Sequence, residues 1–288
     1  MPKGLKFTKW HGCGNDFVFF IDEKNELAVK YDVAKLAVKL CDRHFGIGAD
    51  GVILILPPHD TTANDFRMQI INSDGSEAEM CGNGIRMFAK QVYESGLVDK
   101  MEFRIETGAG IIIPKLNLVN GAVESVTVDM GEPILSGPAI PVSGYGEGEI
   151  VRQPIMVDGR EFRMTCVSMG NPHAVVFMDK EEDCDLIETM GRSFEIHPAF
   201  PAKTNTHFCF VRDNSHIRMR VWERGAAMTL ACGTGSCAVM TAAVLGGRTG
   251  RSAEIELDGG TLQLEWREDN HLYMTGPAIK VFEGALNI

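Results

Sequence analysis

The sequence lacks most of the features that mark secreted, membrane and metal-binding proteins. It has eight cysteines but no Cys-x-x-Cys or His-x-x-x-His pair, so we expect neither a metal site nor a disulfide scaffold. No Asn-x-Ser/Thr glycosylation acceptor occurs. The N-terminal residues have no apolar export segment, and the apolar run at residues 17–21 is too short to span a membrane. We therefore expect a cytoplasmic protein with reduced cysteines.

Positive charge is also scarce. The chain has 28 Lys and Arg against 39 Asp and Glu, a net charge of −11, which disfavours nucleic acid and anionic membranes as partners. Its 44% apolar and 23% charged residues are typical of a globular protein. At roughly 100–200 residues per domain, the 288 residues predict one large domain or two of medium size.

The order of the motifs indicates an internal duplication. Gly-Asn turns occur at residues 14–15 and 170–171, and Cys-Gly-x-Gly occurs at residues 81–84 and 232–235. Arg-Ile-Glu at residues 104–106 similarly matches Glu-Ile-Glu at residues 254–256. Matching motifs in the same order and at nearly equal spacing predict two related halves. The Gly- and Pro-rich segment 136–149 is expected to connect them.

Hydrophobic periodicity predicts strands and helices in both halves. Residues 52–56 predict a buried strand, and residues 123–130 and 261–266 alternate as half-buried strands do. A helix capped by Asp32 is expected from residue 33, and another after each Cys-Gly-x-Gly. Residues 236–245 are small or apolar on nearly every side, which predicts a helix buried all round. The fold class is therefore a two-domain α/β or α+β protein.

A cysteine just before a helix lies where unpaired backbone N–H groups and the positive end of the helix dipole converge. We expect this position to lower the pKa of the thiol, while the flanking glycines let the backbone approach an anion such as a carboxylate. Two such thiols facing one another between the halves could remove a proton from a carbon and return one with inversion. A single such cysteine would more often be a packed residue beside a turn, but the paired copies favour catalysis.

Cofactor chemistry is not expected. No lysine lies in either cysteine loop to form a Schiff base with pyridoxal phosphate. Residues 46–51 spell G-x-G-x-x-G but follow a predicted helix and precede a strand, the reverse of a dinucleotide site. Residues 233–238 fit G-x-G-x-x-A, but the first half has Met87 in place of the third small residue, so nucleotide binding is not predicted there either.

Segments spread over the whole chain resemble the diaminopimelate epimerase family. The resemblance rests on residues 11–17, 72–84, 169–173, 223–235 and 273–278. It implies two pseudo-symmetric domains, each a curled, largely antiparallel β-sheet wrapped round a central α-helix. The last strand would return to the first domain, giving residues 1–130 with 276–288 and residues 131–275. The implied activity interconverts LL- and meso-diaminopimelate in lysine and peptidoglycan precursor synthesis, without a cofactor, in a cytoplasmic homodimer.

The resemblance also implies a role for each matching site residue. Cys81 and Cys232 would be the acid/base pair, and His173 and Glu223 would tune the thiols. Six residues would bind substrate through their side chains, Glu223 among them: Asn15, Asn72, Asn171, Asn205, Glu223 and Arg224. Four residues at the helix starts would also bind substrate: Gly82, Asn83, Gly233 and Thr234.

Two positions depart from the family pattern. Gly51 stands where some members carry a substrate-contacting glutamine, and Phe282 stands where some have a tyrosine linked to dimer contacts. Two alternatives stay open from the sequence. One is a related racemase, independent of pyridoxal phosphate, that acts on another amino acid. The other is a non-catalytic binding or redox module that uses the same cysteines.

Overall fold

The computed structural model describes residues 4–287, which divide into two units. Unit 1 runs to Val128 and resumes at Gly276, and unit 2 is Asp129–Thr275. The boundary expected after residue 130 lies two residues beyond the one that the contacts give. Among residues 4–287, no helix has the length and hydropathy needed to cross a membrane.

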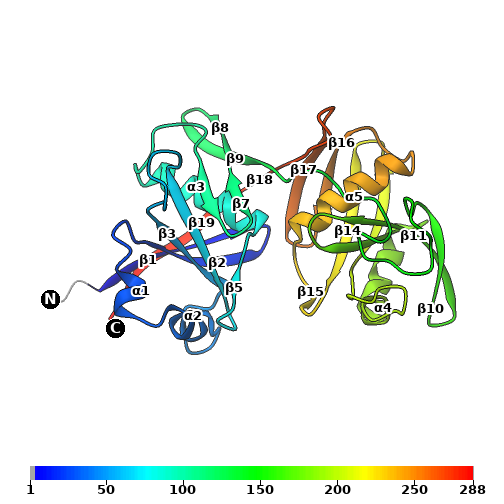
Figure 1. Ribbon diagram of the computed structural model, residues 1–288, viewed down its shortest axis with the longest axis horizontal. Coiled ribbons are helices and arrows are strands. Elements are labelled where there is room, and N and C mark those ends of the chain that lie inside the picture. The colour runs from blue at the N-terminus through cyan, green and yellow to red at the C-terminus, as the bar shows by residue number, and fades with distance from the viewer. Residues whose placement is uncertain (1–3, 288) are drawn as a thin grey trace. The chain divides into compact units, whose positions relative to one another are not determined.

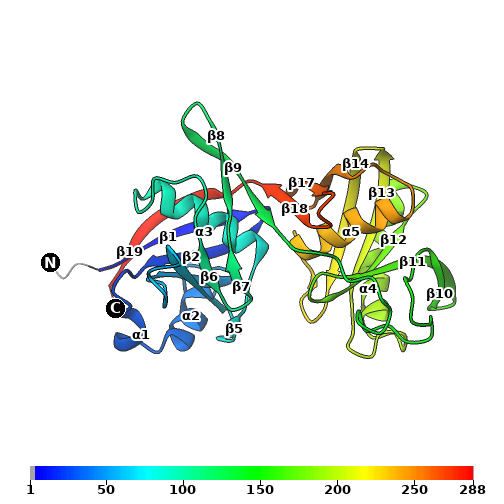
Figure 2. The same ribbon diagram turned by 45° about the horizontal axis from the view of Figure 1, so that its top comes forward.

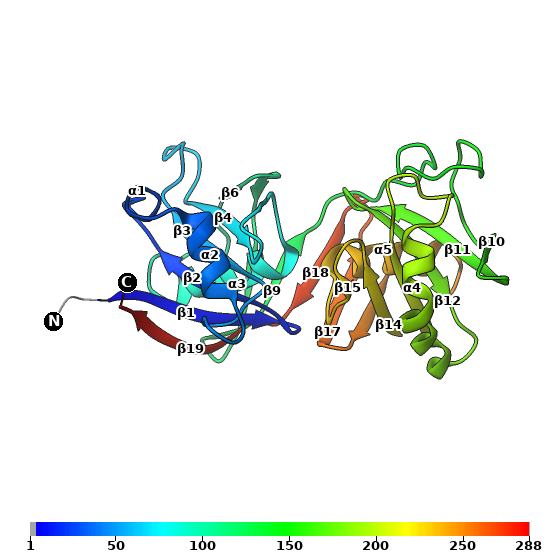
Figure 3. The ribbon, with the colours of Figure 1, turned by 90° about the horizontal axis from the view of Figure 1, so that it is seen from below.

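Unit 1 is built on a mixed sheet with the strand order β19-β1-β2-β3-β4-β6-β7, and β5 pairs with β4. The C-terminal strand β19 lies antiparallel beside β1 (Figures 2 and 3). A hairpin of β8 and β9 follows β7. The strands of this unit are β1 (Leu5–Gly12), β2 (Asn15–Ile21), β3 (Gly51–Leu56), β4 (Phe66–Asn72), β5 (Glu77–Ala78), β6 (Ile105–Thr107), β7 (Gly110–Ile112), β8 (Lys115–Val119), β9 (Ala122–Asp129) and β19 (Ile279–Leu286).

Unit 2 has the strand order β10-β11-β12-β13-β14-β16-β17-β18, and β15 pairs with β14. Its strands are β10 (Gln153–Val157), β11 (Arg160–Ser168), β12 (Pro172–Phe177), β13 (Asn205–Asp213), β14 (His216–Glu223), β15 (Ala227–Met228), β16 (Ser252–Leu257), β17 (Gly260–Trp266) and β18 (Leu272–Gly276).

The two sheets repeat one pattern of strand directions. From β1 to β7 along the sheet, the neighbours are antiparallel, parallel, antiparallel, parallel and antiparallel. From β11 to β17 the sequence of directions is the same. Each parallel pair is joined by a helical crossover. A match at five successive neighbours shows that the halves share one topology, as the repeated motifs predict.

Each unit has one mostly buried helix on one face of its sheet and other helices, which also contribute to an apolar core, on the opposite face. The central helices are α3 in unit 1 and α5 in unit 2 (Figure 1). Helix α3 is followed by β6 and α5 by β16, so they are equivalent crossovers. The helices are α1 (Leu27–Lys30), α2 (Val33–Cys41), α3 (Gly82–Glu94), the 3₁₀ helix η1 (Glu181–Leu186), α4 (Ile187–Glu195) and α5 (Gly233–Leu245).

Strand β3 shows why the sheets need helices on both faces. All six of its residues are buried. Val52, Leu54 and Leu56 belong to the core that includes α2, whereas Ile53 points toward the first turn of α3 at Gly84. A strand covered on both faces reads as a continuous apolar run rather than an alternating one. This explains the sequence of residues 52–56.

The segment at residues 136–149 does not connect the two units, and that prediction was wrong. The chain passes between the units at residues 128 and 129, so the whole segment belongs to unit 2. Ile140 and Val142 are buried in the core of that unit, and Ser136 forms a β-bridge with Glu149. The glycines and prolines therefore shape a folded loop on unit 2 rather than a linker.

Candidate active site

Each Cys-Gly-x-Gly motif places its cysteine at the N-cap of a central helix. Cys81 caps α3 and Cys232 caps α5, and both have extended backbone angles. The first N–H groups of a helix have no partner inside the helix, so each thiol lies beside donors that suit an anion. Cys81 is partly exposed, whereas only 5% of Cys232 is exposed.

The second glycine of each motif leaves room for the thiol. A Cβ on Gly84 would lie 3.3 Å from the Cβ of Cys81 and 3.0 Å from Cδ1 of Ile53. A Cβ on Gly235 would lie 3.1 Å from the Sγ of Cys232 and 2.9 Å from Nε2 of His207. Real Cβ atoms hardly ever come within 3.0 Å of another atom, so a side chain at this position of the second motif would force His207 to move.

In unit 1 the thiol of Cys81 belongs to a network of amide side chains. Its Sγ accepts from the backbone N–H of Gly84 at 3.4 Å and donates to Oδ1 of Asn15 at 3.5 Å. Nδ2 of Asn15 donates to Asp50 at 2.7 Å, which turns Oδ1 toward the thiol. Oδ1 of Asn15 also accepts from Nδ2 of Asn83 at 3.2 Å. Asn15 and Asn83 therefore meet at the start of α3.

Sequence reasoning missed Arg86, which lies beneath this network. Its guanidinium is completely buried and donates to Oδ1 of Asn83 at 2.7 Å and to the carbonyl of Gly82 at 3.0 Å. The Asn83 amide is thus bonded on both sides within the protein. The backbone N–H groups of this turn remain the natural contacts for a carboxylate. No local pattern in the sequence marks Arg86, because it shares its helix face with the polar residues Asn83 and Lys90.

Asn72 lies apart from the Cys81 network in its hydrogen bonding. It ends β4, opposite Gly51 on β3, and its Nδ2 donates to Oγ of Ser76 at 3.0 Å within a turn. Gly51 in turn pairs with Phe17 on β2. A Cβ on Gly51 would lie 2.8 Å from the Phe17 ring and 2.7 Å from the carbonyl oxygen of Ile71, so a glutamine cannot replace Gly51 in this arrangement.

In unit 2 the thiol of Cys232 is held protonated. Burial is the largest influence and raises the pKa of Cys232 well above its usual value, and the neighbouring Glu223 carboxylate raises it further. The Thr234 hydroxyl, 3.6 Å from Sγ, and the backbone N–H of Gly235 act in the opposite direction but do not overcome burial. The expected lowering of a helix-start thiol pKa is therefore wrong for Cys232, because desolvation of the thiolate outweighs the helix N-terminus.

His173 has partners other than the thiol that it was expected to tune. Its Nδ1 lies 2.9 Å from Nε2 of His207, and its Nε2 lies 2.9 Å from Oδ1 of Asn171. Both rings are fully buried, and burial lowers the pKa of His173 and brings that of His207 to about 3. Both imidazoles are therefore neutral near pH 7. The groups that shift the pKa of Cys232 are its own burial, Glu223, Thr234 and Gly235.

The hydrogen-bond sequence fixes the proton positions on this pair. Because Oδ1 of Asn171 can only accept, His173 carries its proton on Nε2 and accepts at Nδ1 from Nε2–H of His207. Nδ1 of His207 is then an acceptor, and it has no partner among residues 4–287. A buried acceptor without a partner is better tolerated than an orphaned N–H. The Asn171 amide oxygen thus fixes the tautomer of His173 and, through it, that of His207, which sequence reasoning missed.

Asn205 and Arg224 meet at the end of β14. Oδ1 of Asn205 accepts from the backbone N–H of Arg224, and its Nδ2 donates to the carbonyl of Pro172, both at 2.9 Å. Nη1 of Arg224 donates to the carbonyl of Ala202 at 3.0 Å, and the residue is exposed. The guanidinium is therefore anchored at one nitrogen and accessible at the others. This geometry suits a carboxylate ligand.

Strand register shows how the duplicated halves have diverged. In unit 1, Phe17 pairs with Gly51, which pairs with Asn72. In unit 2, the matching row starts with His173, which pairs with Asn205. Glu223 completes this row opposite Asn205, because the neighbouring residues Trp222 and Thr206 pair with each other. The ionisable residues of the two rows thus lie in unit 2.

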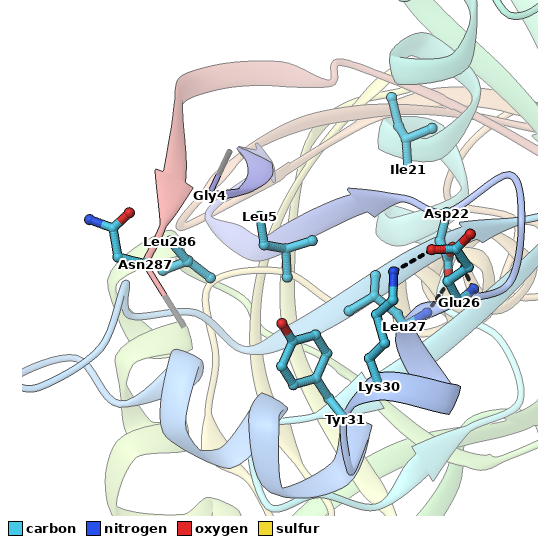
Figure 4. A pocket seen from close by; sticks show the side chains of 10 residues that line it. All are labelled: Gly4, Leu5, Ile21, Asp22, Glu26, Leu27, Lys30, Tyr31, Leu286 and Asn287. Atoms are coloured by element: carbon cyan, nitrogen blue, oxygen red, sulfur yellow. Dashed lines mark hydrogen bonds and ion pairs between the residues drawn. The ribbon is translucent and has the colours of Figure 1, made fainter. Parts of the chain in front are cut away.

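A hollow elsewhere on unit 1 contains none of these residues. It has a volume of about 530 Å³ and lies between β1, α1 and the end of β19 (Figure 4). Its charged side chains already have partners: both oxygens of Asp22 accept backbone N–H groups at the start of α1, and Lys30 pairs with Glu26. Among residues 4–287, no cluster of three or more His, Cys, Asp or Glu side chains could hold a metal ion.

The amino-acid sequence is similar to those of known proteins from one family. The sequence matches the diaminopimelate epimerase family profile over residues 7–136 and 165–281. The chain belongs to the diaminopimelate epimerase family. It is 49% identical over 286 residues to the diaminopimelate epimerase of Acetivibrio thermocellus, with 99% of each chain covered. It is 50% identical to that of Desulfitobacterium hafniense, with 98% of each covered.

Solved structures agree on the fold at much lower identity. The crystal structure of a hydroxyproline epimerase from Agrobacterium vitis with bound trans-4-hydroxy-L-proline aligns with a TM-score of 0.66 at 18% identity. The alignment covers 100% of this chain and 94% of that one. The diaminopimelate epimerase family and this more distant protein therefore share the fold of two sheets, each with a central helix.

Proposed function

We propose that this chain interconverts LL- and meso-diaminopimelate without a cofactor. The observation that carries the proposal is the pair of cysteines at the first turns of topologically equivalent helices, in a chain that belongs to the diaminopimelate epimerase family over nearly its whole length. The acid, the base and the N–H donors that the reaction needs all come from the chain itself.

Cys81 and Cys232 act as the two acid/base groups of this proposal. One thiolate removes the α-proton, and the other thiol returns a proton to the opposite face of the same carbon, which inverts it. Because its pKa is raised, Cys232 is the protonated thiol when substrate binds, and Cys81 is the group that accepts the α-proton. In the reverse direction the Cys232 thiolate is the base, and its high pKa makes it a stronger one.

The carbanion formed in this reaction needs stabilisation because the α-proton of an amino acid is only weakly acidic. We assign this role to the backbone N–H groups at the two helix starts, from Gly82 and Asn83 on α3 and from Gly233 and Thr234 on α5. Preorganised N–H donors near developing negative charge are among the largest contributions to catalysis of this kind.

The distal amino acid end of diaminopimelate needs a second set of polar contacts. The accessible guanidinium of Arg224 suits its carboxylate, and the Asn15, Asn72 and Asn171 amides suit its ammonium and carboxylate groups. Asn205 supports this set from below because its buried amide holds the backbone of Arg224.

Isomerisation of purified protein with separate LL- and meso-diaminopimelate, followed by chiral chromatography, tests the proposal. We expect conversion of both isomers and none of proline, hydroxyproline or glutamate. Cys81→Ala and Cys232→Ala should each abolish turnover, while Cys41→Ala, at a buried cysteine on α2, retains it. Conversion of another amino acid instead would favour a related racemase, and no conversion of any would favour a non-catalytic thiol module.

The proposal extends to assembly and location. We propose a homodimer that uses β19, the edge strand of the unit 1 sheet, where Ile279, Val281 and Phe282 are 47%, 55% and 45% exposed. Exposed apolar residues along an edge strand favour pairing with another chain. We also propose a cytoplasmic location, since a reducing compartment keeps the two catalytic thiols available.

A further inference from the structure

Helix α4 of unit 2 carries a buried carboxylate, Glu195, that lies outside the acid/base machinery. Only 2% of its side chain is exposed, yet it accepts hydrogen bonds from Trp222 and Gly225 and forms ion pairs with Arg192 and Lys203. Its Oε2 lies 2.9 Å from Nε1 of Trp222 and 3.1 Å from Nη1 of Arg192. Its Oε1 lies 3.3 Å from the backbone N–H of Gly225 and 3.7 Å from Nζ of Lys203. A buried charge is tolerated only when it is paired in this way.

Two of these donors belong to the segment that carries the proposed site. Trp222 immediately precedes Glu223 and Arg224, and Gly225 immediately follows them. The two oxygens of Glu195 therefore hold the segment on either side of Glu223 and Arg224. Helix α4 packs against β14, the strand that ends at Glu223 (Figure 3).

The packing beneath Trp222 is equally specific. A Cβ on Gly191 would lie 2.5 Å from Cδ2 of the Trp222 indole, so the ring lies directly against the helix backbone there. Gly191 and Glu195 are four residues apart and lie on the same face of α4. Gly191 makes room for the Trp222 ring, and Glu195 accepts a hydrogen bond from the N–H of that ring.

The backbone of the segment is fixed by side chains from two other elements. The N–H of Arg224 donates to Asn205, and the N–H of Gly225 donates to Glu195. Gly225 has a φ of +79°, and the N–H of Ala226 donates to the carbonyl of Glu223, which closes the turn. The directions in which Glu223 and Arg224 leave the backbone follow from these bonds.

The charge of Glu195 matters because both of its carboxylate oxygens must accept hydrogen bonds. Burial acts to raise the pKa of Glu195, but the Trp222 N–H, Arg192 and the Gly225 N–H outweigh it, so the carboxyl is ionised near neutral pH. Glutamine has the same shape but only one acceptor oxygen. Its NH₂ group would face either the indole and Arg192 or the backbone N–H of Gly225 and Lys203.

We propose that Glu195 is a positioning residue for substrate binding, holding Trp222 and Gly225 so that Glu223 stays beside Cys232 and Arg224 stays directed at the distal carboxylate. This inference rests on the proposed function for the identity of the ligand. Glu195 does not touch the reacting atoms; it acts through the turn at residues 223–225.

The test compares Glu195→Gln with Glu188→Gln. Glu188 lies on the same helix and bonds Arg220 at 2.8 Å, so its variant removes a carboxylate from α4 without touching the turn. Loss of a hydrogen bond to a charged group corresponds to roughly a tenfold change. We expect Glu195→Gln to raise the KM for diaminopimelate about tenfold, and Glu188→Gln to leave it unchanged.

The split between KM and kcat separates positioning from stability. A purely structural role lowers the fraction of folded enzyme, which reduces the apparent kcat and leaves KM unchanged. The indole N–H resonance of Trp222, identified with Trp222→Phe, should also shift in Glu195→Gln. If Glu195→Gln does not fold, Glu195→Asp, which keeps the charge and moves the oxygens, should raise KM to a smaller degree.

A folded Glu195 variant with wild-type KM would overturn the inference. Failure of the proposed function gives a different result, because the wild-type protein would then not convert diaminopimelate at all.

Discussion

The protonation of Cys232 is decided by its immediate surroundings more than by its position on a helix. Burial of the thiol and the neighbouring Glu223 carboxylate both disfavour the thiolate. The hydrogen bonds from Thr234 and Gly235 favour it but are weaker. The sequence identified the helix start and the nearby Glu223, but burial of a side chain depends on contacts from distant segments and could not be foreseen.

Replacing Glu223 with glutamine should lower the pKa of Cys232. The carboxylate charge raises that pKa, so its removal shifts thiolate formation to lower pH. Thiolate absorbance near 240 nm, followed against pH with Cys232→Ser as the blank, measures the shift. The wild-type Cys232 should remain a thiol at neutral pH. An unchanged or higher pKa in Glu223→Gln would contradict this assignment.

At the scale of elements, the helix starts and the strand ends place the site. The capped helices after residues 32, 81 and 232, and the buried strand at residues 52–56, could be predicted because their signals are local. The His173–His207 pair and Glu195 beneath the turn could not, since each joins segments that meet only through strand pairing or helix packing. The segment at 136–149 was misplaced because loop composition does not distinguish a linker from a packed loop.

The glycines that follow the cysteines should differ in their tolerance of alanine. In Gly235→Ala the new methyl group would collide with His207 and Cys232, which should cost about 1–3 kcal/mol of unfolding free energy and most of the activity. In Gly84→Ala the tightest contact is the end of the Ile53 side chain, and the gain of about 1 kcal/mol in helix propensity offsets it.

Urea unfolding and turnover measurements on both variants test this order. Gly250→Ala is the control because its new methyl group would meet open space. A Gly235→Ala protein as stable and active as Gly84→Ala would count against the packing described for the second motif.

At the scale of the whole molecule, duplication gave two units of the same topology that then diverged. The same order of parallel and antiparallel neighbours occurs in both sheets, yet Phe17, Gly51 and Asn72 in one row correspond to His173, Asn205 and Glu223 in the other. The repeated motifs made the topology predictable. The different chemistry of the two rows became visible only with the strand register.

The proposed dimer should depend on the exposed edge of β19. A charge at Val281 would have to be buried on pairing, so Val281→Glu should raise the dimer dissociation constant at least about tenfold. Val29→Glu, at an 85% exposed position on α1, is the matched control. Sedimentation velocity over a range of protein concentrations measures both. A Val281→Glu dimer as stable as wild type would exclude this edge as the interface.

The proton-transfer chemistry is tested most directly by isomerising LL-diaminopimelate in deuterated water. We predict that the meso product carries solvent deuterium at the inverted α-carbon, because the thiol that returns the proton has exchanged with solvent. Neither Cys81→Ala nor Cys232→Ala should form deuterated meso product, because a single thiol returns a proton only to the face from which it removed one. Meso product formed by the wild-type protein without deuterium at that carbon, or deuterated meso product from either cysteine variant, would contradict the two-thiol mechanism.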